Sequence, residues 1–405
     1  MYFFYFYIVS ILLFGAFTIG PFSIRVYMTV IMLLYLLIVY SKKKYLNTTP
    51  IPKGFLKGYL LFIIFSALAL ILNGEYDEYD FNKWLLANFL NCFVSFYAVD
   101  YFIKDTNKLQ NFMYVLIGLI VCNAIVTLLQ FIGNPIGNLI AVAFTTSSEV
   151  RSSITDGGAL VTFGAGLPRG LFGHVFTNGT MLATLGILCL FPIENKQRIK
   201  SFIFLFLLLF CLYASFVTQE RAAFFAFLLM AIFLFFIGPS SKMMKSSVAV
   251  TIVFLVVTIL PALIFSEKLG RLAISDSYEE DPRVEIWSYC FSFIKENLIL
   301  GGPVSYYKRT EAAPHNFFLL VLIHYGLLGG LIISYLYFIM VIQAIKKILK
   351  RYSYETTVLA GSVCIYSALS LFHNASIATG DTIIFIIYPL MLKSFIIDKR
   401  KMGAS

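Results

Sequence analysis

The sequence has 405 residues, of which 60% are hydrophobic and only 13% are charged, and its mean hydropathy is +0.85. Soluble domains average about 25% charged residues, so this composition excludes an ordinary soluble protein and predicts an all-α, polytopic membrane protein. The net charge of +10 could suggest a nucleic-acid partner, but most basic residues lie in short segments between apolar runs. That distribution is the positive-inside pattern of membrane proteins, and we expect no nucleic-acid binding.

Apolar runs follow one another along the chain. A spanning helix needs about 20 mostly apolar residues, and by this measure we predict about twelve spans in a single transmembrane domain, residues 1–405. The candidate runs are 2–20, 22–40, 56–72, 84–103, 111–132, 171–193, 201–218, 222–237, 247–265, 316–345, 354–373 and 382–397. The first run has no basic leader and no small-residue cleavage site, so we expect a spanning helix rather than a signal peptide. Gly326, Gly329 and Gly330 predict that the run 316–345 breaks and continues.

Charge sets the predicted orientation of these spans. Basic clusters such as SKKK (41–44), KKILKR (346–351) and KRK (399–401) would face the cytoplasm if both termini lie there, and acidic residues then concentrate on the opposite side. This arrangement satisfies the positive-inside rule. The acidic turn GEYDEYD (74–80) falls on the outer side, where we expect it to be solvated.

Two outer loops are long, at about 133–170 and 266–315, and long loops in compact proteins are often functional. The second holds a predicted helix at about 282–298, with Asp281 as its N-cap and Pro282 at its first position. An apolar stripe is predicted along it, formed by Val284, Trp287, Phe291, Ile294 and Leu298. Such an amphipathic helix is too short and too charged to span, so we expect it to lie at the outer membrane–water boundary, with Gly301-Gly302-Pro303 ending it.

Arginines recur at the predicted outer ends of the spans, where basic residues are otherwise scarce. They are Arg151, Arg169, Arg221 and Arg283. A single arginine at a helix end most often extends its charge to the lipid headgroups. Several of them together suit a different role, because guanidinium groups bind phosphate oxygens bidentately. The pattern therefore predicts a site for a lipid-linked pyrophosphate, with snorkelling arginines as the alternative.

The four histidines also fall in the predicted outer half of the bundle. His315 follows a polar loop and precedes a long apolar run, which places an imidazole at the edge of the membrane. A lone histidine is most often a hydrogen-bonded structural residue, but its ordinary pKa near 6.5 also suits proton transfer. No group of acidic or histidine residues has metal-ligand spacing, so we expect no metal and no other cofactor. The six cysteines predict neither a disulfide framework nor a zinc site.

Several segments together resemble the O-antigen polymerase (Wzy) and O-antigen ligase (WaaL) superfamily of integral-membrane glycosyltransferases. Its C-terminal pattern of Arg and Trp, a glycine turn and a His-Asn before a glycine-containing helix is similar to DPRVEIW (281–287), FSFIKENLILGG (291–302) and PHNFFLLVLIHYGLLGG (314–330). Its arginine turn is similar to TQERAAFFAF (218–227), and its R-x-x-G segment to PRGLFGHVFTNGT (168–180). By motif, the resemblance covers roughly residues 165–345 and is otherwise one of topology. The chain departs from the family where Glu220 replaces a frequent serine and where Gly301-Gly302-Pro303 replaces Gly-x-Gly.

The resemblance implies metal-independent glycan transfer at the outer face of the bacterial inner membrane, from a donor linked to undecaprenyl pyrophosphate. It implies that His315 is the general base and that Arg169 and Arg221 hold the leaving pyrophosphate. The other candidate substrate-binding residues are Arg151, Arg283, Arg309 and Asn316. Membrane lipid and a chain-length regulator protein are the further partners that it suggests.

Within this superfamily we favour a polymerase, which extends a second lipid-linked repeat unit, because of the compact size and the lack of a large outer C-terminal extension. An O-antigen ligase, which transfers the glycan to lipid A core, is the alternative. A flippase for lipid-linked oligosaccharide is a third hypothesis. It predicts repeats and charges at mid-membrane, whereas here the ionisable residues gather at the outer ends of the spans.

Overall fold

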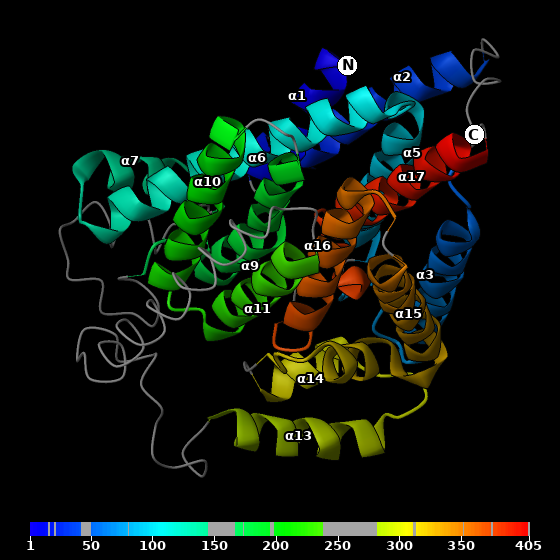
Figure 1. Cartoon of the computed structure of the whole chain (residues 1–405). Coiled ribbons are helices and arrows are strands. Elements are labelled where there is room, and N and C mark those ends of the chain that lie inside the picture. The colour runs from blue at the N-terminus through cyan, green and yellow to red at the C-terminus, as the bar shows by residue number, and fades with distance from the viewer. Residues whose placement is uncertain are drawn as a thin grey trace. The chain divides into compact units, whose positions relative to one another are not determined.

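The structure is a computed structural model (Figure 1). It describes residues 1–14, 17–19, 22–41, 50–79, 81–144, 167–172, 174–194, 198–237, 282–310, 313–350, 352–373 and 376–403. The chain divides into two compact units, Met1–Phe112 with Asp281–Ser405 (unit 1) and Met113–Glu280 (unit 2). The single transmembrane domain expected from the sequence stays a prediction.

Almost all described elements are helices. Unit 1 contains α1 (Tyr2–Leu13), β1 (Thr18–Ile19), β2 (Phe22–Ser23), α2 (Ile24–Ser41), α3 (Gly54–Leu72), α4 (Phe81–Trp84), the π-helix η1 (Leu85–Leu90), α5 (Asn91–Phe102), α13 (Pro282–Glu296), α14 (Pro303–Arg309), α15 (Phe317–Leu349), α16 (Tyr354–Ser370), the 3-10 helix η5 (Ile377–Thr379) and α17 (Ile384–Gly403). Unit 2 contains α7 (Pro135–Phe144), α9 (Val175–Gly186), the 3-10 helix η2 (Ile187–Glu194), α10 (Arg198–Val217) and α11 (Arg221–Ile237), and α6 (Thr106–Phe131) passes from unit 1 into unit 2.

The helices confirm a multi-pass membrane protein. Among the described residues, six helices are long and apolar enough to cross a membrane, and α1 and α11 are shorter apolar helices. Every predicted span contains a described helix except 247–265, which lies outside the described residues. Within the described residues, the expected all-α fold has one exception, the antiparallel pair β1–β2, in which Thr18 pairs with Ser23 and Ile19 with Phe22. The sequence also gave no sign of α7, which begins the long loop 133–170. The count of about twelve spans stays a prediction.

In unit 1, α15 packs against α3 and α16, and α17 packs against α16 and α5. The N-terminus and the C-terminal end of α17 lie at the same end of this unit, and α13 and α14 lie at the opposite end (Figure 1). This arrangement agrees with two termini on one side of a membrane and a helical cap on the other. The assignment of the termini to the cytoplasm stays a prediction.

The predicted break in α15 occurs at Gly326, whose φ of 55° and ψ of −158° are not helical. The chain after α13 fills this break: Gly302 N–H donates to the Ile323 carbonyl at 2.7 Å, and Leu327 N–H donates to the Leu298 carbonyl at 2.8 Å. A Cβ atom on Gly326 would collide with the Ile299 carbonyl, and one on Gly301 would lie 2.6 Å from the Ile323 carbonyl. Two glycines are therefore needed for two backbones to meet, and backbone groups freed by the break are satisfied within the protein.

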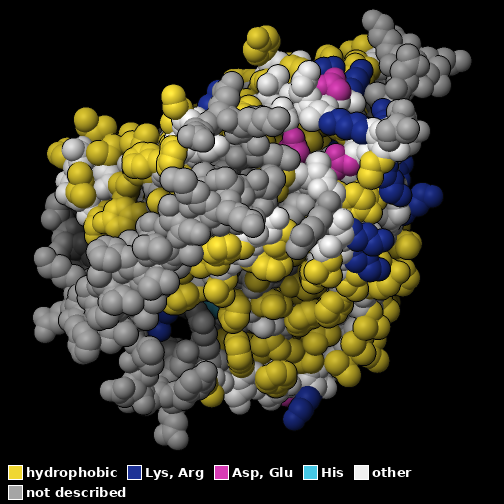
Figure 2. Space-filling model, in the orientation of Figure 1, with side chains coloured by type: hydrophobic (Ala, Val, Ile, Leu, Met, Phe, Trp, Pro, Cys, Tyr) yellow, Lys and Arg dark blue, Asp and Glu magenta, His cyan; other side chains and the backbone are white. Residues whose placement is uncertain are grey.

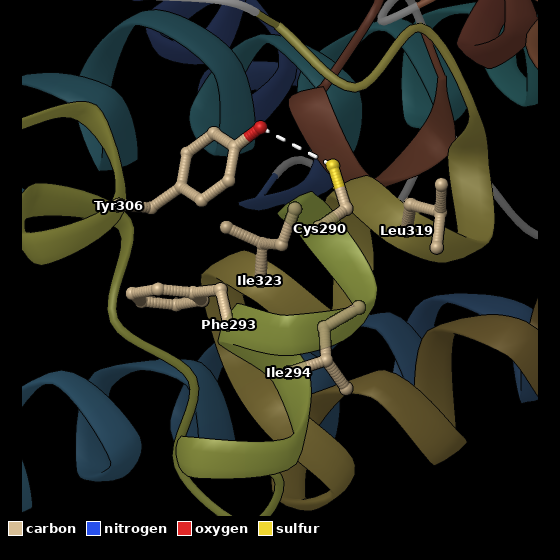
Figure 3. Close-up of a cluster of buried hydrophobic side chains, with 6 residues drawn as sticks. All are labelled: Cys290, Phe293, Ile294, Tyr306, Leu319 and Ile323. Atoms are coloured by element: carbon tan, nitrogen blue, oxygen red, sulfur yellow. Dashed lines mark hydrogen bonds between the residues drawn. The ribbon is translucent and has the colours of Figure 1, made fainter. Parts of the chain in front are cut away.

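Helix α13 is amphipathic, but its buried face differs from the predicted stripe. Figure 3 shows Cys290, Phe293 and Ile294 of α13 facing Tyr306 of α14 and Leu319 and Ile323 of α15. The prediction was wrong for three of its residues, because the exposed fractions of Val284, Phe291 and Leu298 are 52%, 55% and 43%. The helix packs on α14 and α15 along one side, which leaves an adjacent apolar side uncovered within unit 1. Its predicted N-cap, Asp281, lies outside the described residues.

A buried ion pair joins α5 to α17 at the end of unit 1 where the termini lie. Lys393 Nζ donates to Asp100 Oδ1 at 2.6 Å, and both side chains are only 2% exposed. The same carboxylate oxygen accepts from the Ile51 N–H at 3.0 Å. Removing one partner leaves the other charge buried without an opposite charge, which generally costs more than the pair itself contributes.

We therefore expect Lys393→Ala to lower the free energy of unfolding by about 3–5 kcal/mol, measured by thermal unfolding of the purified protein in detergent. The matched control is Lys308→Ala, which removes the pair between Lys308 and Glu78, whose side chains are 66% and 57% exposed. That change should cost less than about 1 kcal/mol, because solvent screens an exposed pair. Equal losses in the two variants would contradict the assignment of Lys393.

Candidate active site

His315 has an unusual backbone conformation. Its φ is +48°, and among the described residues only one other non-glycine residue, Gln219, has a positive φ. For a residue with a Cβ atom, the left-handed region costs roughly 1–2 kcal/mol. Such strain persists only when the surroundings impose it, and it concentrates at functional sites. The question is therefore what holds His315 there.

Both neighbours of His315 are held by side chains or carbonyls from other elements. Trp287 of α13 donates its indole N–H to the Pro314 carbonyl at 2.9 Å. Asn316 is the N-cap of α15, and its side-chain oxygen accepts from the N–H groups of Phe318 and Leu319 at 2.9 and 3.2 Å. Its Nδ2 donates to the Leu371 carbonyl, just after α16, at 3.1 Å. His315 is thus fixed from α13, α15 and the end of α16, and its side chain is only partly buried.

These contacts give Asn316 a clear structural role. Its amide oxygen caps α15, and its amide nitrogen joins α15 to the residue after α16. Both polar atoms of the amide are therefore used in positioning the segment that carries His315. The predicted contact of Asn316 with substrate is untested and stays a prediction.

Helix α14 is held in place by a residue that we expected to be solvated. The carboxylate of Glu75 accepts from the N–H groups of Val304 and Ser305, each at 2.8 Å, and from the Ser305 hydroxyl. Glu75 is 7% exposed, so the expectation of a solvated acidic turn was wrong at this position. A carboxylate at the first turn of a helix satisfies N–H groups that have no partner within the helix.

Arg309, at the last turn of α14, faces α13. Its Nη1 donates to Glu296 Oε2 at 2.9 Å, and its guanidinium lies 5.6 Å from the centre of the Phe293 ring. The bond to Glu296 raises the pKa of Arg309. Both side chains are more than half exposed, so this pair ties α14 to α13 without burying its charge. A role for Arg309 in substrate binding stays a prediction.

His324 is a structural histidine. It is 8% exposed, its Nδ1 lies 3.3 Å from the Tyr79 hydroxyl, and its Nε2 lies 3.4 Å from the Tyr307 hydroxyl. Both ring nitrogens therefore have tyrosine partners. This environment matches the general expectation for a lone histidine, and it distinguishes His324 from His315 at the start of the same helix.

In unit 2, the segment that carries Arg169 rests on a buried polar network. Gln130 Oε1 of α6 accepts from the N–H groups of Arg169 and Gly170 at 2.8 and 2.9 Å. Asn123 Oδ1, also on α6, accepts from the Leu171 N–H at 2.7 Å. Asn178 of α9 donates to the Pro168 carbonyl at 3.1 Å and accepts from Asn123 Nδ2 at 2.7 Å.

This network fixes the backbone of residues 168–171 while leaving the side chain of Arg169 only partly buried. Burial lowers the pKa of Arg169, but a guanidinium remains charged at any physiological pH. These supporting residues were not among the predicted site residues. A signal was present, since Asn123, Thr127 and Gln130 recur at helical spacing and mark one polar face within an apolar span.

Gly170 fits between the two asparagines of this network. Its φ is +57°, and a Cβ atom there would collide with the side-chain oxygens of Asn123 and Asn178. We expect Gly170→Ala to lower the free energy of unfolding by about 1–3 kcal/mol and to reduce the glycan transfer that the resemblance implies. Gly118→Ala is the control, because its Cβ atom on α6 would meet nothing within 4 Å. Thermal unfolding and transfer assays measure both effects, and equal behaviour of the two variants would contradict this role for Gly170.

The second arginine turn reaches the same part of α9. Gln219 has a φ of +57°, and Arg221 begins α11 with an exposed side chain. Glu220 between them is 4% exposed, and its carboxylate packs so closely on Gly179 that a Cβ atom there would collide with it. Gly179 follows Asn178, which holds the Arg169 segment. The two arginine motifs therefore converge on adjacent residues of α9.

The predicted site residues fall into two groups. Arg169 and Arg221 lie in unit 2, and His315, Asn316 and Arg309 lie in unit 1. Arg283 lies in the first turn of α13, but its side chain is not described, and Arg151 lies outside the described residues. The structure thus brings the two arginine turns together within one unit and fixes His315 within the other.

A comparison with family models decides the relationship that these motifs suggest. Residues 204–334 match the family described as O-antigen ligase. This match supports the O-antigen ligase and polymerase superfamily for the chain. The matched segment includes Arg221, Arg283, Arg309 and the Pro314-His315-Asn316 sequence, whereas Arg169 precedes it. A search of curated proteins found no match.

The family segment contains both described non-glycine residues with a positive φ, Gln219 and His315. Gln219 lies two residues before Arg221, and His315 is itself the titratable residue of its motif. The strained backbone therefore lies at or next to two of the predicted site residues, and the family match supports a broad function in O-antigen ligation or polymerisation.

Proposed function

We propose that the protein is an O-antigen polymerase of the bacterial inner membrane. It transfers a glycan from undecaprenyl pyrophosphate to the non-reducing end of another lipid-linked repeat unit on the periplasmic side. The observation that carries this proposal is the strained His315, which Trp287 and Asn316 fix from both sides within the segment that matches the family.

In the proposed reaction, the imidazole of His315 accepts the proton of an acceptor hydroxyl. The oxygen attacks the anomeric carbon of the donor, a new C–O bond forms, and the bond to the pyrophosphate oxygen breaks. The electron pair of that bond leaves with the pyrophosphate. Arg169 and Arg221 stabilise the developing negative charge by electrostatic preorganisation, with no metal required. Arg151, Arg283 and Arg309 are proposed to assist in binding the substrates.

Two features of unit 2 support the role of the arginines. The backbone on both sides of Arg169 is fixed by Gln130, Asn123 and Asn178, so little ordering is needed when a ligand binds. Arg221 has an exposed side chain at the first residue of α11. A helix N-terminus favours negative charge, which adds to the attraction of the guanidinium for pyrophosphate.

An O-antigen ligase is the second candidate, since the matching family is described by that activity. A ligase would use the same base and the same pyrophosphate site, but its acceptor would be lipid A core. The deletion of the gene separates the two functions when surface polysaccharide is displayed by size. Loss of a polymerase leaves single repeat units on lipid core, whereas loss of a ligase leaves lipid-linked polymer that is not attached.

The same experiment tests the more distant alternative. Loss of a flippase would trap repeat units on the cytoplasmic side, where periplasmic enzymes cannot reach them. A full ladder of polysaccharide lengths on lipid core in the deletion strain would contradict both the polymerase and the ligase proposals. Chain length itself depends on a regulator protein in our proposal, and a change in modal length alone would point to that partner.

A further inference from the structure

Lys347 is a buried cation that the proposed reaction does not use. It lies near the C-terminal end of α15, at the end of unit 1 that we predict to face the cytoplasm, and its side chain is 7% exposed. Some described side chains bury a nitrogen or oxygen that has no hydrogen-bond partner, and the ammonium of Lys347 is not one of these groups. The apolar stem is therefore buried, while the charge lies where it can reach the surface.

Lys347 and Lys399 share one aromatic ring. Lys347 Nζ lies 4.6 Å from the centre of the Phe395 ring, and Lys399 Nζ lies 4.8 Å from the same centre. Tyr352 packs against the Phe395 ring in an edge-to-face arrangement, with 4.7 Å between the ring centres. Lys399 follows Phe395 by one turn of α17 and is exposed. Two positively charged ammonium groups therefore lie near one ring, and their repulsion raises the free-energy cost of keeping both charged.

The acidic side chains at this end of unit 1 have other partners. Asp398 accepts from the Ser353 N–H at 3.2 Å and from the Thr356 hydroxyl at 2.7 Å. Asp100 binds Lys393, and Glu355 accepts from Gln110 at 2.6 Å. Within the described part of the chain, no carboxylate forms an ion pair with Lys347 or Lys399.

Cation–π contact compensates only part of the cost of burying a lysine. An anion placed between the two ammonium groups would satisfy both charges. Other basic side chains surround the position, since Lys346 and Lys350 are exposed on the last turns of α15. Figure 2 shows Lys and Arg side chains gathered on the side where α17 ends, with some Asp and Glu among them, above a largely hydrophobic surface. Clusters of this kind, at the border of an apolar surface, suit the phosphate of an anionic lipid.

We propose that Lys347 and Lys399, with Phe395 between them, form a phosphate-binding site at the cytoplasmic end of unit 1. The occupant is the headgroup of an anionic phospholipid from the inner leaflet, and free phosphate is the other source of the same chemistry. Its phosphate would bridge the ends of α15 and α17. This site lies at the opposite end of the unit from His315, so its occupancy does not depend on the proposed reaction.

The purified full-length protein is titrated in detergent with phosphatidylglycerol, with phosphatidylcholine and with inorganic phosphate, and bound ligand is counted by native mass spectrometry. We expect phosphatidylglycerol to bind more tightly than phosphatidylcholine. Lys347→Met and Lys399→Gln should each weaken that binding about fivefold, as expected for one lysine near a membrane surface. Lys57→Gln, an exposed lysine at the same predicted end, is the matched control and should leave binding unchanged.

The arms of this titration distinguish the two sources. Binding of phosphatidylglycerol that inorganic phosphate does not displace supports the lipid headgroup, whereas displacement at millimolar phosphate supports a free anion in the same site. Lys399 is exposed, so its variant tests the site even if Lys347→Met unfolds the protein. Equal binding of phosphatidylglycerol to the wild type and to Lys399→Gln, or equal binding of the two lipids, would overturn the proposal.

Discussion

Replacement of His315 by asparagine is expected to abolish glycan transfer while leaving the fold intact. Asparagine tolerates a positive φ better than most residues, and glycine tolerates it without a steric cost, so neither change disturbs the backbone at +48°. Both remove the imidazole. We expect kcat to fall by about 10²–10⁴-fold in each variant, the usual contribution of a general base. Transfer by the purified protein between lipid-linked repeat units measures the effect.

The asparagine and glycine substitutions separate the effect of losing the imidazole from the effect of straining the backbone. His315→Ala would mix the two effects, because alanine is strained at this φ, whereas His315→Gly and His315→Asn isolate the side chain. Added imidazole should restore part of the activity of His315→Gly, since the removed side chain leaves space for it. A His315→Asn variant that produces the full ladder of chain lengths would show that His315 only positions the start of α15.

Replacement of Arg169 or Arg221 by lysine is expected to lower kcat about 10²-fold or more, the scale of losing one preorganised group that stabilises the transition state. Lysine keeps the charge but loses the planar pair of donors that bind two phosphate oxygens at once. The loss should be larger for kcat than for donor binding if the guanidinium acts on the leaving pyrophosphate. Steady-state kinetics with varied donor concentration measures both quantities.

The matched control for these variants is Arg400→Lys, at the end of the chain that we predict to be cytoplasmic. It carries the same chemical change and should leave transfer within about twofold of the wild type, as for an exposed residue at the opposite end of unit 1 from His315. Full activity of Arg221→Lys would exclude a bidentate role for that guanidinium. Loss of donor binding alone, with kcat unchanged, would move the arginines from transition-state stabilisation to substrate recognition.

Some features of the motif residues can be predicted from the sequence, whereas others depend on the tertiary structure. The order Arg221, Arg283, Trp287, His315 is visible along the chain, and the resemblance that it suggested agrees with the family match at residues 204–334. The role of Trp287 is not visible there, because it depends on a hydrogen bond to Pro314, 27 residues away. The same holds for Asn316, whose second bond reaches Leu371. A motif shows which residue types are present, whereas their positioning depends on contacts between distant elements.

Helix α13 shows the limit of sequence periodicity. Residues at helical spacing predicted one apolar stripe, and an amphipathic helix was indeed present. Which apolar residues are buried depends on the position of its neighbours, α14 and α15, and those neighbours cover Cys290 and Phe293 rather than Val284 and Phe291. A helix with apolar residues on more than half of its circumference leaves this choice open until it packs.

The sequence by itself determined the class of the protein, the positions of most described helices, the break in α15 and the resemblance to the superfamily. Each of these follows from local composition: hydropathy over about 20 residues, charge between the spans, and glycine where helical backbone ends. Only the tertiary structure decided that Gly326, and not Gly329 or Gly330, is the break. Gly326 alone faces the backbone of Gly301, and a backbone that enters a helix must do so where no side chain blocks it.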